Sequence, residues 1–278
     1  MPQADFSQEK PHFVAPGLGT ETSLEHSPVG GSRRQSPLCS FSVKKRCIYK
    51  HFQKGPGNRG YAVFMSNLQD QLDQITANTR NLVQPERLEI SERAVAELYA
   101  AGVEDRILQV GSRAPEFALP DAAGRIVRST DLLALGPLVI NFFRGRWCPY
   151  CITELESWRD LYGAVRKRGA LLIGISPQTV RQNDFTAVQH GLPFPVLTDA
   201  GCQVAAQFGL AYSVAPSHQR YYRSILVNIP LVNGDASWRL PLPATYIVGV
   251  DGTILFAGAH ADFRVRPEPR EVLDVLSP

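Results

Sequence analysis

The sequence has no run of 18 or more apolar residues, and its first thirty residues mix charge, proline and glycine. A membrane-spanning helix needs about 20 consecutive apolar residues. A secretory signal needs a shorter apolar core of its own. The absence of both patterns predicts a cytoplasmic protein that has no membrane partner.

Cysteine is scarce as well. The 278 residues include only five cysteines, at positions 39, 47, 148, 151 and 202. Small secreted domains instead carry a dense, even-numbered set of cysteines paired in disulfides. An odd and sparse set in a long chain favours a reducing compartment and one functional pair.

An excess of charge of one sign is missing from most of the chain. Residues 1–64 hold nine Lys and Arg against four Asp and Glu, whereas the remaining residues hold 20 against 22. The net charge of +3 therefore comes from the first segment, and the rest of the chain is close to neutral. Nucleic-acid-binding domains present a basic face, so we expect no nucleic-acid partner.

Composition divides the chain into three parts. Residues 1–64 are rich in Pro, Gly, Ser and charge and lack periodicity. Such a segment buries too little apolar surface to offset its chain entropy, so we expect a disordered basic leader. Met65 directly precedes the first predicted helix and is a candidate for the true translation start, in which case residues 1–64 are an over-extension. The pattern over residues 65–106 predicts two helices, the second beginning at Pro85. Residues 107–278 are expected to form the catalytic domain.

Within residues 107–278, predicted strands alternate with predicted helices. The turn at 121–124 indicates an N-terminal hairpin, and the continuous apolar run 138–143 is typical of a strand buried on both faces. A helix is predicted from Pro149, whereas residues 210–242 read as a long irregular insertion. The pattern predicts an α/β fold with a central mixed sheet flanked by helices.

Cys148 and Cys151 lie where the predicted buried strand gives way to the predicted helix. A thiol reacts as its thiolate, which the free N–H groups at a helix start stabilise. Arg144 and Arg146 lie just upstream and add positive potential. With two residues between them, either sulfur can resolve a sulfenic acid or mixed disulfide formed on the other. We therefore interpret this pair as a redox-active dithiol.

Two less reactive interpretations of Cys148 and Cys151 are possible. A Cys-x-x-Cys can be half of a zinc site, but no second such pair exists, and two inert core cysteines are the other alternative. The position between a strand and a helix argues against both, so we expect no metal and no cofactor. Cys202 is either a further resolving cysteine or a packed helix residue, and the second interpretation is favoured. Glu154 is interpreted as a first-turn helix acid.

Four ordered motifs resemble the peroxiredoxin-like branch of the alkyl hydroperoxide reductase and thiol-specific antioxidant family. The resemblance runs from about residue 66 to the C-terminus and implies a thioredoxin-like fold with an added N-terminal hairpin. The motifs are Val110-Gly-x-x-Ala-Pro-x-Phe-x-Leu-Pro-Asp121, Phe143-Arg-Gly-Arg-Trp-Cys-Pro-Tyr-Cys-x-x-Glu-Leu155, Ile175-Ser-Pro-Gln178 and Pro241-Leu-Pro-Ala-Thr-Tyr-Ile-Val-Gly-Val-Asp-Gly252.

The same register exposes a departure from the family. Peroxiredoxins use a Pro-x-x-x-Thr-x-x-Cys loop and a distant arginine. Here Cys151 takes the peroxidatic position, Cys148 stands in place of the threonine, and Arg144 stands in place of the proline. The distant arginine is expected just before the strand near Ala244, where this chain has Pro243. A proline there resembles the cis-proline of thioredoxins, so the site resembles a thioredoxin-type dithiol in a peroxiredoxin scaffold.

The resemblance implies a thioredoxin-dependent peroxiredoxin that reduces hydrogen peroxide or organic hydroperoxides through a Cys148/Cys151 disulfide. The order of attack stays open, because the family register makes Cys151 the peroxidatic residue and thioredoxin logic makes Cys148 the nucleophile. The candidate supporting residues are Arg144, Arg146, Trp147, Pro149 and Pro243.

The expected partners are a peroxide and thioredoxin or another dithiol reductant, and a homodimer is one of the oligomeric states open to the chain. Two other functions remain open at this point. One is a thiol:disulfide oxidoreductase that acts on proteins. The other is a non-catalytic redox sensor, in which the aromatic residues Tyr221, Tyr222 and Trp238 of the insertion line a binding groove or pack the loop.

Overall fold

A computed structural model describes residues 67–276 of the chain. The predicted disordered leader and the candidate start at Met65 lie outside these residues. Within the described range, no helix is long and apolar enough to cross a membrane.

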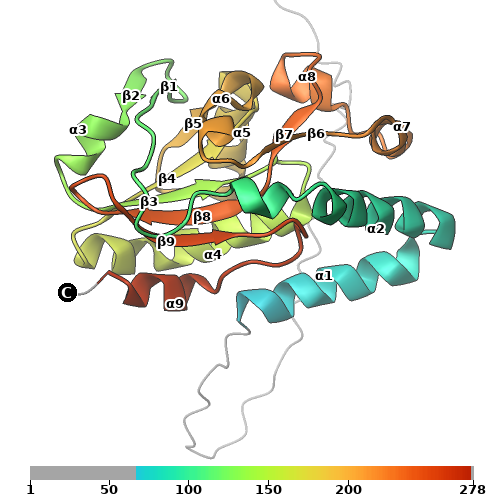
Figure 1. Ribbon diagram of the computed structural model, residues 1–278, viewed down its shortest axis with the longest axis horizontal. Coiled ribbons are helices and arrows are strands. Elements are labelled where there is room, and N and C mark those ends of the chain that lie inside the picture. The colour runs from blue at the N-terminus through green and yellow to red at the C-terminus, as the bar shows by residue number, and fades with distance from the viewer. Residues whose placement is uncertain (1–66, 277–278) are drawn as a thin grey trace, which may run out of the picture. The chain divides into compact units, whose positions relative to one another are not determined.

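A five-stranded mixed sheet forms the centre of the molecule (Figure 1). Its strand order is β5-β4-β3-β8-β9, in which β3, β4 and β5 run parallel while β8 and β9 pair antiparallel. All five residues of β3 are buried, as the uninterrupted apolar run predicts. The strands are β3 Leu138–Phe142, β4 Leu171–Ser176, β5 Val196–Thr198, β8 Ala244–Val248 and β9 Ile254–Ala259.

Two short antiparallel pairs stand outside the central sheet. The strands β1 (Ala118–Pro120) and β2 (Ile126–Arg128) form the predicted N-terminal hairpin. The other pair joins β6 (Ala211–Ser213) to β7 (Arg239–Pro241). The predicted mixed α/β class and the hairpin are thus confirmed.

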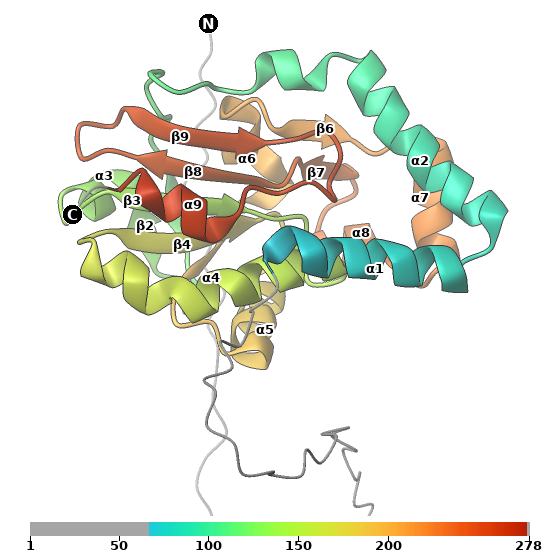
Figure 2. The ribbon, with the colours of Figure 1, turned by 90° about the horizontal axis from the view of Figure 1, so that it is seen from below.

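Helices cover both faces of the central sheet and leave two buried cores. One core includes residues of α3, α6 and η1, and the other includes residues of α1, α4 and α9. Helices α1, α4 and α9 lie on the same side of the sheet (Figures 1 and 2). The helices are α1 Leu68–Leu82, α2 Pro85–Ala100, η1 Val103–Arg106, α3 Ser129–Leu133, α4 Pro149–Lys167, α5 Val180–His190, η2 Ala200–Cys202, α6 Gln203–Gln207, α7 Pro216–Ser224, α8 Ile229–Asn233 and α9 Pro269–Asp274.

The first helix docks by its N-terminal half. Asn67 caps α1 with its side-chain oxygen, which accepts a hydrogen bond of 2.8 Å from the Asp70 amide. Leu68 and Leu72 are buried in the core beside α4, whereas Leu82 at the other end of the helix is 84% exposed. Helix α1 is therefore buried at its N-terminal end and exposed at its C-terminal end.

The prediction of an irregular insertion over residues 210–242 is wrong. The segment contains β6, α7, α8 and β7 in succession. Its helices are short, of nine and five residues, and α7 has a mostly polar sequence, so neither produces a long apolar stripe. A separate buried cluster holds the segment together, made of Val214, Tyr222, Ile229, Trp238 and Leu240.

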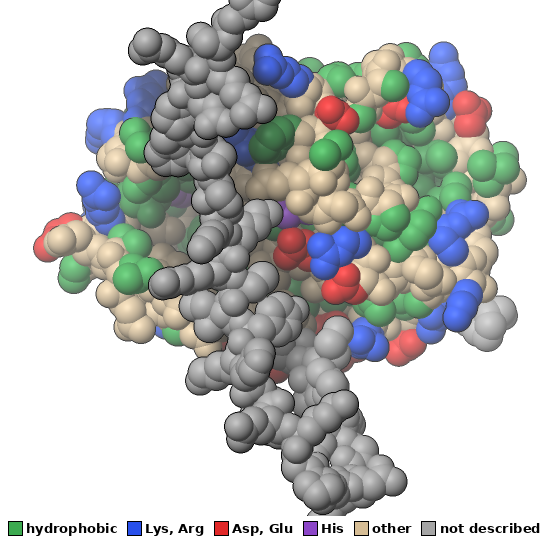
Figure 3. Space-filling view, turned by 180° about the vertical axis from the view of Figure 1, so that it is seen from behind, with side chains coloured by type: hydrophobic (Ala, Val, Ile, Leu, Met, Phe, Trp, Pro, Cys, Tyr) green, Lys and Arg blue, Asp and Glu red, His purple; other side chains and the backbone are tan. Residues whose placement is uncertain are grey.

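Acidic and basic side chains are interspersed on the face shown in Figure 3. That distribution agrees with the near-neutral balance of charge outside the first 64 residues.

Candidate active site

The two cysteines lie at the junction of β3 and α4. Cys148 is the N-cap of α4, Pro149 occupies the first helical position, and Cys151 lies in the first turn. The Cys148 carbonyl already accepts the hydrogen bond of a helical turn from the Ile152 amide. Both cysteines are fully buried and are free thiols. A thiolate at this position is stabilised by the positive end of the helix dipole.

Arg144 contacts the first sulfur directly. Its Nη2 donates to the Cys148 Sγ at 3.1 Å, and its Nη1 donates to the Tyr222 hydroxyl at 3.3 Å. The guanidinium is buried, with its Cζ 3.9 Å from the centre of the Phe263 ring and 5.1 Å from that of Trp147. Aromatic faces and the Cys148 sulfur thus take the place of water around this charge.

Arg266 lies at the second sulfur and was not identified from the sequence. It follows β9 and points its Nη2 toward the Cys151 Sγ at 3.6 Å. Its Nη1 forms a buried ion pair with Glu154, whose other oxygen accepts from Asn141 at 2.8 Å and from Thr245 at 3.1 Å. No spacing in the sequence connects Arg266 with the dithiol 115 residues earlier.

Glu154 is therefore more than a helix acid at the surface. Its side chain is buried, and burial raises its pKa against the opposing charge of Arg266. The interpretation of Glu154 as a first-turn acid that complements the helix dipole misses this ion pair. A buried carboxylate and a buried guanidinium require each other, because either charge alone would be strongly destabilising.

The surroundings shift the pKa values of the two thiols in opposite directions. Burial opposes ionisation of both, but the hydrogen bond from Cys151 and the charges of Arg144 and Arg266 bring the pKa of Cys148 well below its usual range. Burial and the neighbouring Cys148 raise the pKa of Cys151 well above its usual range. The structure thus favours a Cys148 thiolate beside a protonated Cys151.

A pocket of about 200 Å³ opens above Cys148. Its walls come from α1, α2, α7 and the loop after β9, and both Cys148 and Arg144 line it, whereas Cys151 does not. Cys148 has no exposed surface outside the protein and lines this pocket, so we expect a substrate to approach its sulfur through the pocket. The apolar and aromatic part of the lining consists of Leu88, Trp147, Pro149, Tyr150, Tyr221, Tyr222, Ile225, Val227 and Phe263.

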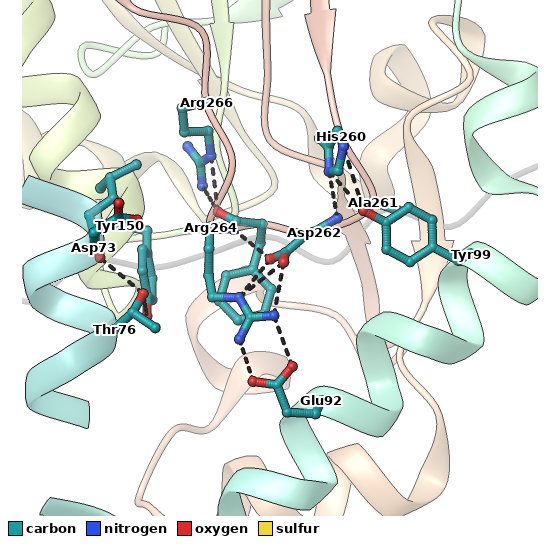
Figure 4. Close-up of polar contacts among 12 residues, drawn as sticks. Asp73, Thr76, Glu92, Tyr99, Tyr150, His260, Ala261, Asp262, Arg264 and Arg266 are labelled. Carbon is teal, nitrogen blue, oxygen red and sulfur yellow. Dashed lines mark hydrogen bonds and ion pairs between the residues drawn. The ribbon is translucent and has the colours of Figure 1, made fainter. Parts of the chain in front are cut away.

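The loop after β9 connects the pocket wall to the dithiol. Figure 4 shows Arg264 reaching from this loop to Glu92 on α2 while also pairing with Asp262. The same figure shows His260 beside Tyr99 of α2, with the Tyr99 hydroxyl 3.0 Å from His260 Nδ1. Arg266, two residues beyond Arg264, contacts Cys151. One short segment therefore links the second helix to the Cys151 sulfur.

The structure brings only some of the predicted supporting residues to the sulfurs. Arg144 and Trp147 lie in the site, and Pro149 lines the pocket. Arg146 is exposed and turns away, because its Nε donates to Gln182 and its Cζ lies 4.7 Å from the centre of the Phe185 ring. Pro243 is buried directly before β8, the strand that pairs with β3.

Two further predictions are resolved by position. Cys202 is buried in the core that contains α3 and α6, whereas Cys148 and Cys151 belong to the other core. This separation agrees with the interpretation of Cys202 as a packed residue. In the insertion, Tyr221 and Tyr222 line the pocket, but Trp238 packs within the buried cluster of the insertion.

The fold and the site together define a thioredoxin-like protein with a dithiol at a helix start. Residues 110–257, just over half of the chain, match the AhpC/TSA family. This chain belongs to that family. The match ends before Arg266 and begins after the two N-terminal helices.

Individual relatives agree with this family. A candidate peroxiredoxin of Mycobacterium tuberculosis is 35% identical over 103 residues, which is 37% of this chain and 67% of that protein. The thiol-disulfide oxidoreductase ResA of Geobacillus thermodenitrificans is 33% identical over 108 residues, 38% of this chain and 61% of that protein. The chloroplastic peroxiredoxin Q of Oryza sativa subsp. japonica is 32% identical over 114 residues, 40% of this chain and 52% of that protein. The matches thus span between about half and two thirds of these relatives.

Solved structures are similar as well. The crystal structure of peroxidoxin BcpB from Mycobacterium tuberculosis is 25% identical with a TM-score of 0.48 and covers 61% of this chain and 96% of that one.

Proposed function

We propose that this protein is a thiol-dependent peroxidase that reduces hydrogen peroxide or organic hydroperoxides through a Cys148/Cys151 dithiol–disulfide cycle. The observation that carries the proposal is the pairing of a sulfur held as thiolate by Arg144 with a pocket that leads to it. A second thiol, Cys151, lies directly behind the first and can resolve its oxidised form.

The reaction follows from the different environments of the two sulfurs. The Cys148 thiolate attacks the hydroxyl oxygen of the peroxide, an S–O bond forms as the O–O bond breaks, and the leaving oxygen takes a proton from solvent and departs as water or alcohol. Cys148 is then a sulfenic acid. The Cys151 thiol attacks its sulfur, so an S–S bond forms and the hydroxyl leaves as water with the Cys151 proton.

This assignment makes Cys148 the attacking residue in spite of the family register. Three observations support it: Cys148 lines the pocket, it accepts a hydrogen bond from Arg144, and its pKa is lowered while that of Cys151 is raised. A nucleophile must be ionised and must face its substrate. Cys151 meets neither requirement, because it does not line the pocket and its pKa is raised.

The cycle closes when a donor reduces the Cys148–Cys151 disulfide. Thioredoxin or another dithiol is the proposed donor, and a reducing compartment such as the cytoplasm supplies it in reduced form. An attack on Cys148 Sγ from the pocket leaves Cys151 as the departing thiol.

Peroxide turnover by the full chain tests the proposal. We expect the reduced protein to consume hydrogen peroxide or cumene hydroperoxide with dithiothreitol, or with thioredoxin, thioredoxin reductase and NADPH. The Cys148→Ser variant should abolish turnover, and the Cys202→Ser variant should retain it. The proposal is overturned if the fully reduced protein, with both thiols titratable, consumes no peroxide with either donor.

A second candidate function is that of a thiol:disulfide oxidoreductase. The likeness to the oxidoreductase named ResA and the Cys-x-x-Cys at a helix start favour it. Reduction of insulin by the reduced protein, at a rate above that of its own peroxide turnover, would favour this candidate.

A further inference from the structure

Peroxide reduction requires hydrogen-bond donors at the oxygen that leaves, because negative charge develops there as the O–O bond breaks. The threonine that supplies a hydroxyl in the family loop is replaced here by Cys148. The floor of the pocket must therefore supply such a donor from elsewhere.

Tyr222 brings a hydroxyl to the required position. It lines the pocket together with Cys148, and its oxygen accepts from Arg144 Nη1 at 3.3 Å while Arg144 Nη2 contacts the Cys148 sulfur at 3.1 Å. The phenol oxygen and the sulfur are thus held by two nitrogens of one guanidinium. An oxygen bound at the sulfur lies beside both the guanidinium and the phenol.

The phenol keeps its proton and its orientation. Burial raises the pKa of Tyr222 far above neutral pH, despite the charge of Arg144. The ring stacks on His218 with centroids 4.4 Å apart and contacts Trp147 edge-on at 5.1 Å. Among the described residues no acceptor is recorded for the hydroxyl hydrogen, so it is available to a ligand in the pocket.

Two further donors on residues beside Cys148 are also without partners in the described part of the chain. Arg144 Nε and Trp147 Nε1 are buried, and neither has a hydrogen-bond partner in the described part of the chain. Both residues line the same pocket as Tyr222. A buried donor without an acceptor is costly, and a peroxide has oxygen lone pairs that satisfy such groups.

We propose that Tyr222 is a catalytic residue whose hydroxyl donates a hydrogen bond to the leaving oxygen of the peroxide, an inference that rests on the proposed peroxidase function. In this step the Cys148 sulfur forms the S–O bond, the O–O bond breaks, and the electron pair stays on the leaving oxygen. Tyr222 and Arg144 stabilise that charge until the oxygen takes a proton from solvent and leaves as water or alcohol.

The test compares two reactions of Cys148 in the same proteins. Oxidation by peroxide needs a donor to the leaving oxygen, whereas alkylation by iodoacetamide needs only the thiolate. In Tyr222→Phe the ring and its stacking on His218 remain. We expect its second-order rate constant for peroxide to fall roughly 10-fold to 100-fold, while alkylation at pH 7 stays within about twofold of wild type.

Two variants serve as controls. Tyr162→Phe removes a phenol hydroxyl from α4 outside the pocket, where the ring packs near Phe194, and should leave both rates unchanged. Tyr212→Phe removes a second phenol that lies against Arg144 but does not line the pocket. This variant measures what the loss of one phenol beside Arg144 does when the Tyr222 hydroxyl is still present. We expect its rate constant for peroxide to exceed that of Tyr222→Phe by at least about 5-fold.

Each other outcome is decisive. Equal losses of peroxide oxidation and alkylation in Tyr222→Phe would mean that the phenol only positions Arg144, and the proposal would be wrong. An unchanged peroxide rate in this variant would also overturn it. Failure of the peroxidase proposal is seen separately, because in that case wild-type protein itself shows no reaction of Cys148 with peroxide.

Discussion

At the scale of single residues, two buried arginines divide the dithiol into unlike halves. Arg144 bonds to Cys148, whereas Arg266 points at Cys151 but is engaged by Glu154. A guanidinium that is neutralised by a carboxylate does less for a nearby anion than one whose partner is the anion itself. This asymmetry accounts for the opposite directions in which the pKa values of Cys148 and Cys151 are shifted.

The first prediction concerns Arg144. Arg144→Gln removes the charge beside Cys148 but keeps a polar side chain, so the pKa of Cys148 should rise. The pH profile of iodoacetamide alkylation measures it, and the rate at pH 6 should fall at least about 10-fold. Arg146→Gln is the matched control, because its side chain faces α5 and should leave the profile unchanged. Similar shifts in both variants would contradict the assignment.

A second prediction rests on His218. Burial and the charge of Arg144 lower its pKa to about 4. The unfolded chain, with a pKa near 6.5, then binds this proton before the folded chain does as the pH falls. Folding stability should therefore decrease from pH 7 to pH 4.5, and His218 alone should account for about 2 kcal/mol of that loss.

Urea unfolding of the reduced protein at the two pH values measures this loss. His218→Phe keeps a ring against Tyr222 and removes the titration, so this variant should lose about 2 kcal/mol less than wild type between pH 7 and pH 4.5. The assignment is wrong if wild type and variant lose the same amount.

The dithiol and its contact with Arg144 are predictable from the sequence, whereas Arg266 and its ion pair with Glu154 are not. Cys148, Cys151 and Arg144 lie within eight residues, so local spacing brings them together. Arg266 arrives through the turn after β9, and a single sequence carries no signal for such a long-range contact. Arg146 shows the opposite error, since closeness in sequence did not bring it to the sulfurs.

At the scale of elements, the start of α4 fixes the dithiol. Gly145 has a φ of +151°, and a Cβ there would meet the Trp147 Nε1 at 2.5 Å. The loop from β3 into α4 is thus closed tightly enough to exclude any larger residue at this position. The buried strand β3 and the helix start were both predictable, because a long apolar run and a proline at the first helical turn are strong local signals.

The N-terminal helices also form part of the wall of the pocket beside Cys148. Residues of α1 and α2 line the pocket, and the Thr76 hydroxyl on α1 lies 3.1 Å from that of Tyr150 on α4. We propose that residues 65–106 act with residues 107–278 as one catalytic unit, although the family match begins only at residue 110.

The third prediction tests the docking of α1. Leu72 is fully buried, so Leu72→Ala should lower the free energy of unfolding by about 2 to 4 kcal/mol through loss of packing and creation of a cavity. Leu82→Ala, on the same helix but 84% exposed, should change it by less than about 0.5 kcal/mol. Chemical denaturation of the two variants measures the difference. Equal values would show that α1 does not pack as described.

The helices of the insertion over residues 210–242 could not be predicted from the sequence pattern. Helix α7 carries the sequence Pro-Ser-His-Gln-Arg-Tyr-Tyr-Arg-Ser from residue 216, which has few apolar positions for a periodic stripe. Its aromatic residues pack against a cluster that includes Trp238 and Leu240, and both come from later in the chain. The tertiary contact, and not the local propensity, defines this helix.

At the scale of the whole molecule, a common fold has been modified around one centre. The central sheet and α4 present the dithiol, while α1, α2 and α7 enclose the space above it. We therefore expect the parts of the chain that flank or interrupt the common fold to influence which substrate enters the pocket. The fold class was predictable from the alternation of strands and helices, but the enclosure was not, because it depends on contacts between distant segments.

The most direct test of the account is the position of the sulfenic acid after a single addition of peroxide. Reduced Cys151→Ser and Cys148→Ser are each treated with one equivalent of hydrogen peroxide and dimedone, and the labelled cysteine is located by mass spectrometry. The account predicts a dimedone adduct on Cys148 in Cys151→Ser and no adduct on Cys151 in Cys148→Ser. An adduct on Cys151 in Cys148→Ser, with Cys148 unlabelled in the other variant, would contradict it.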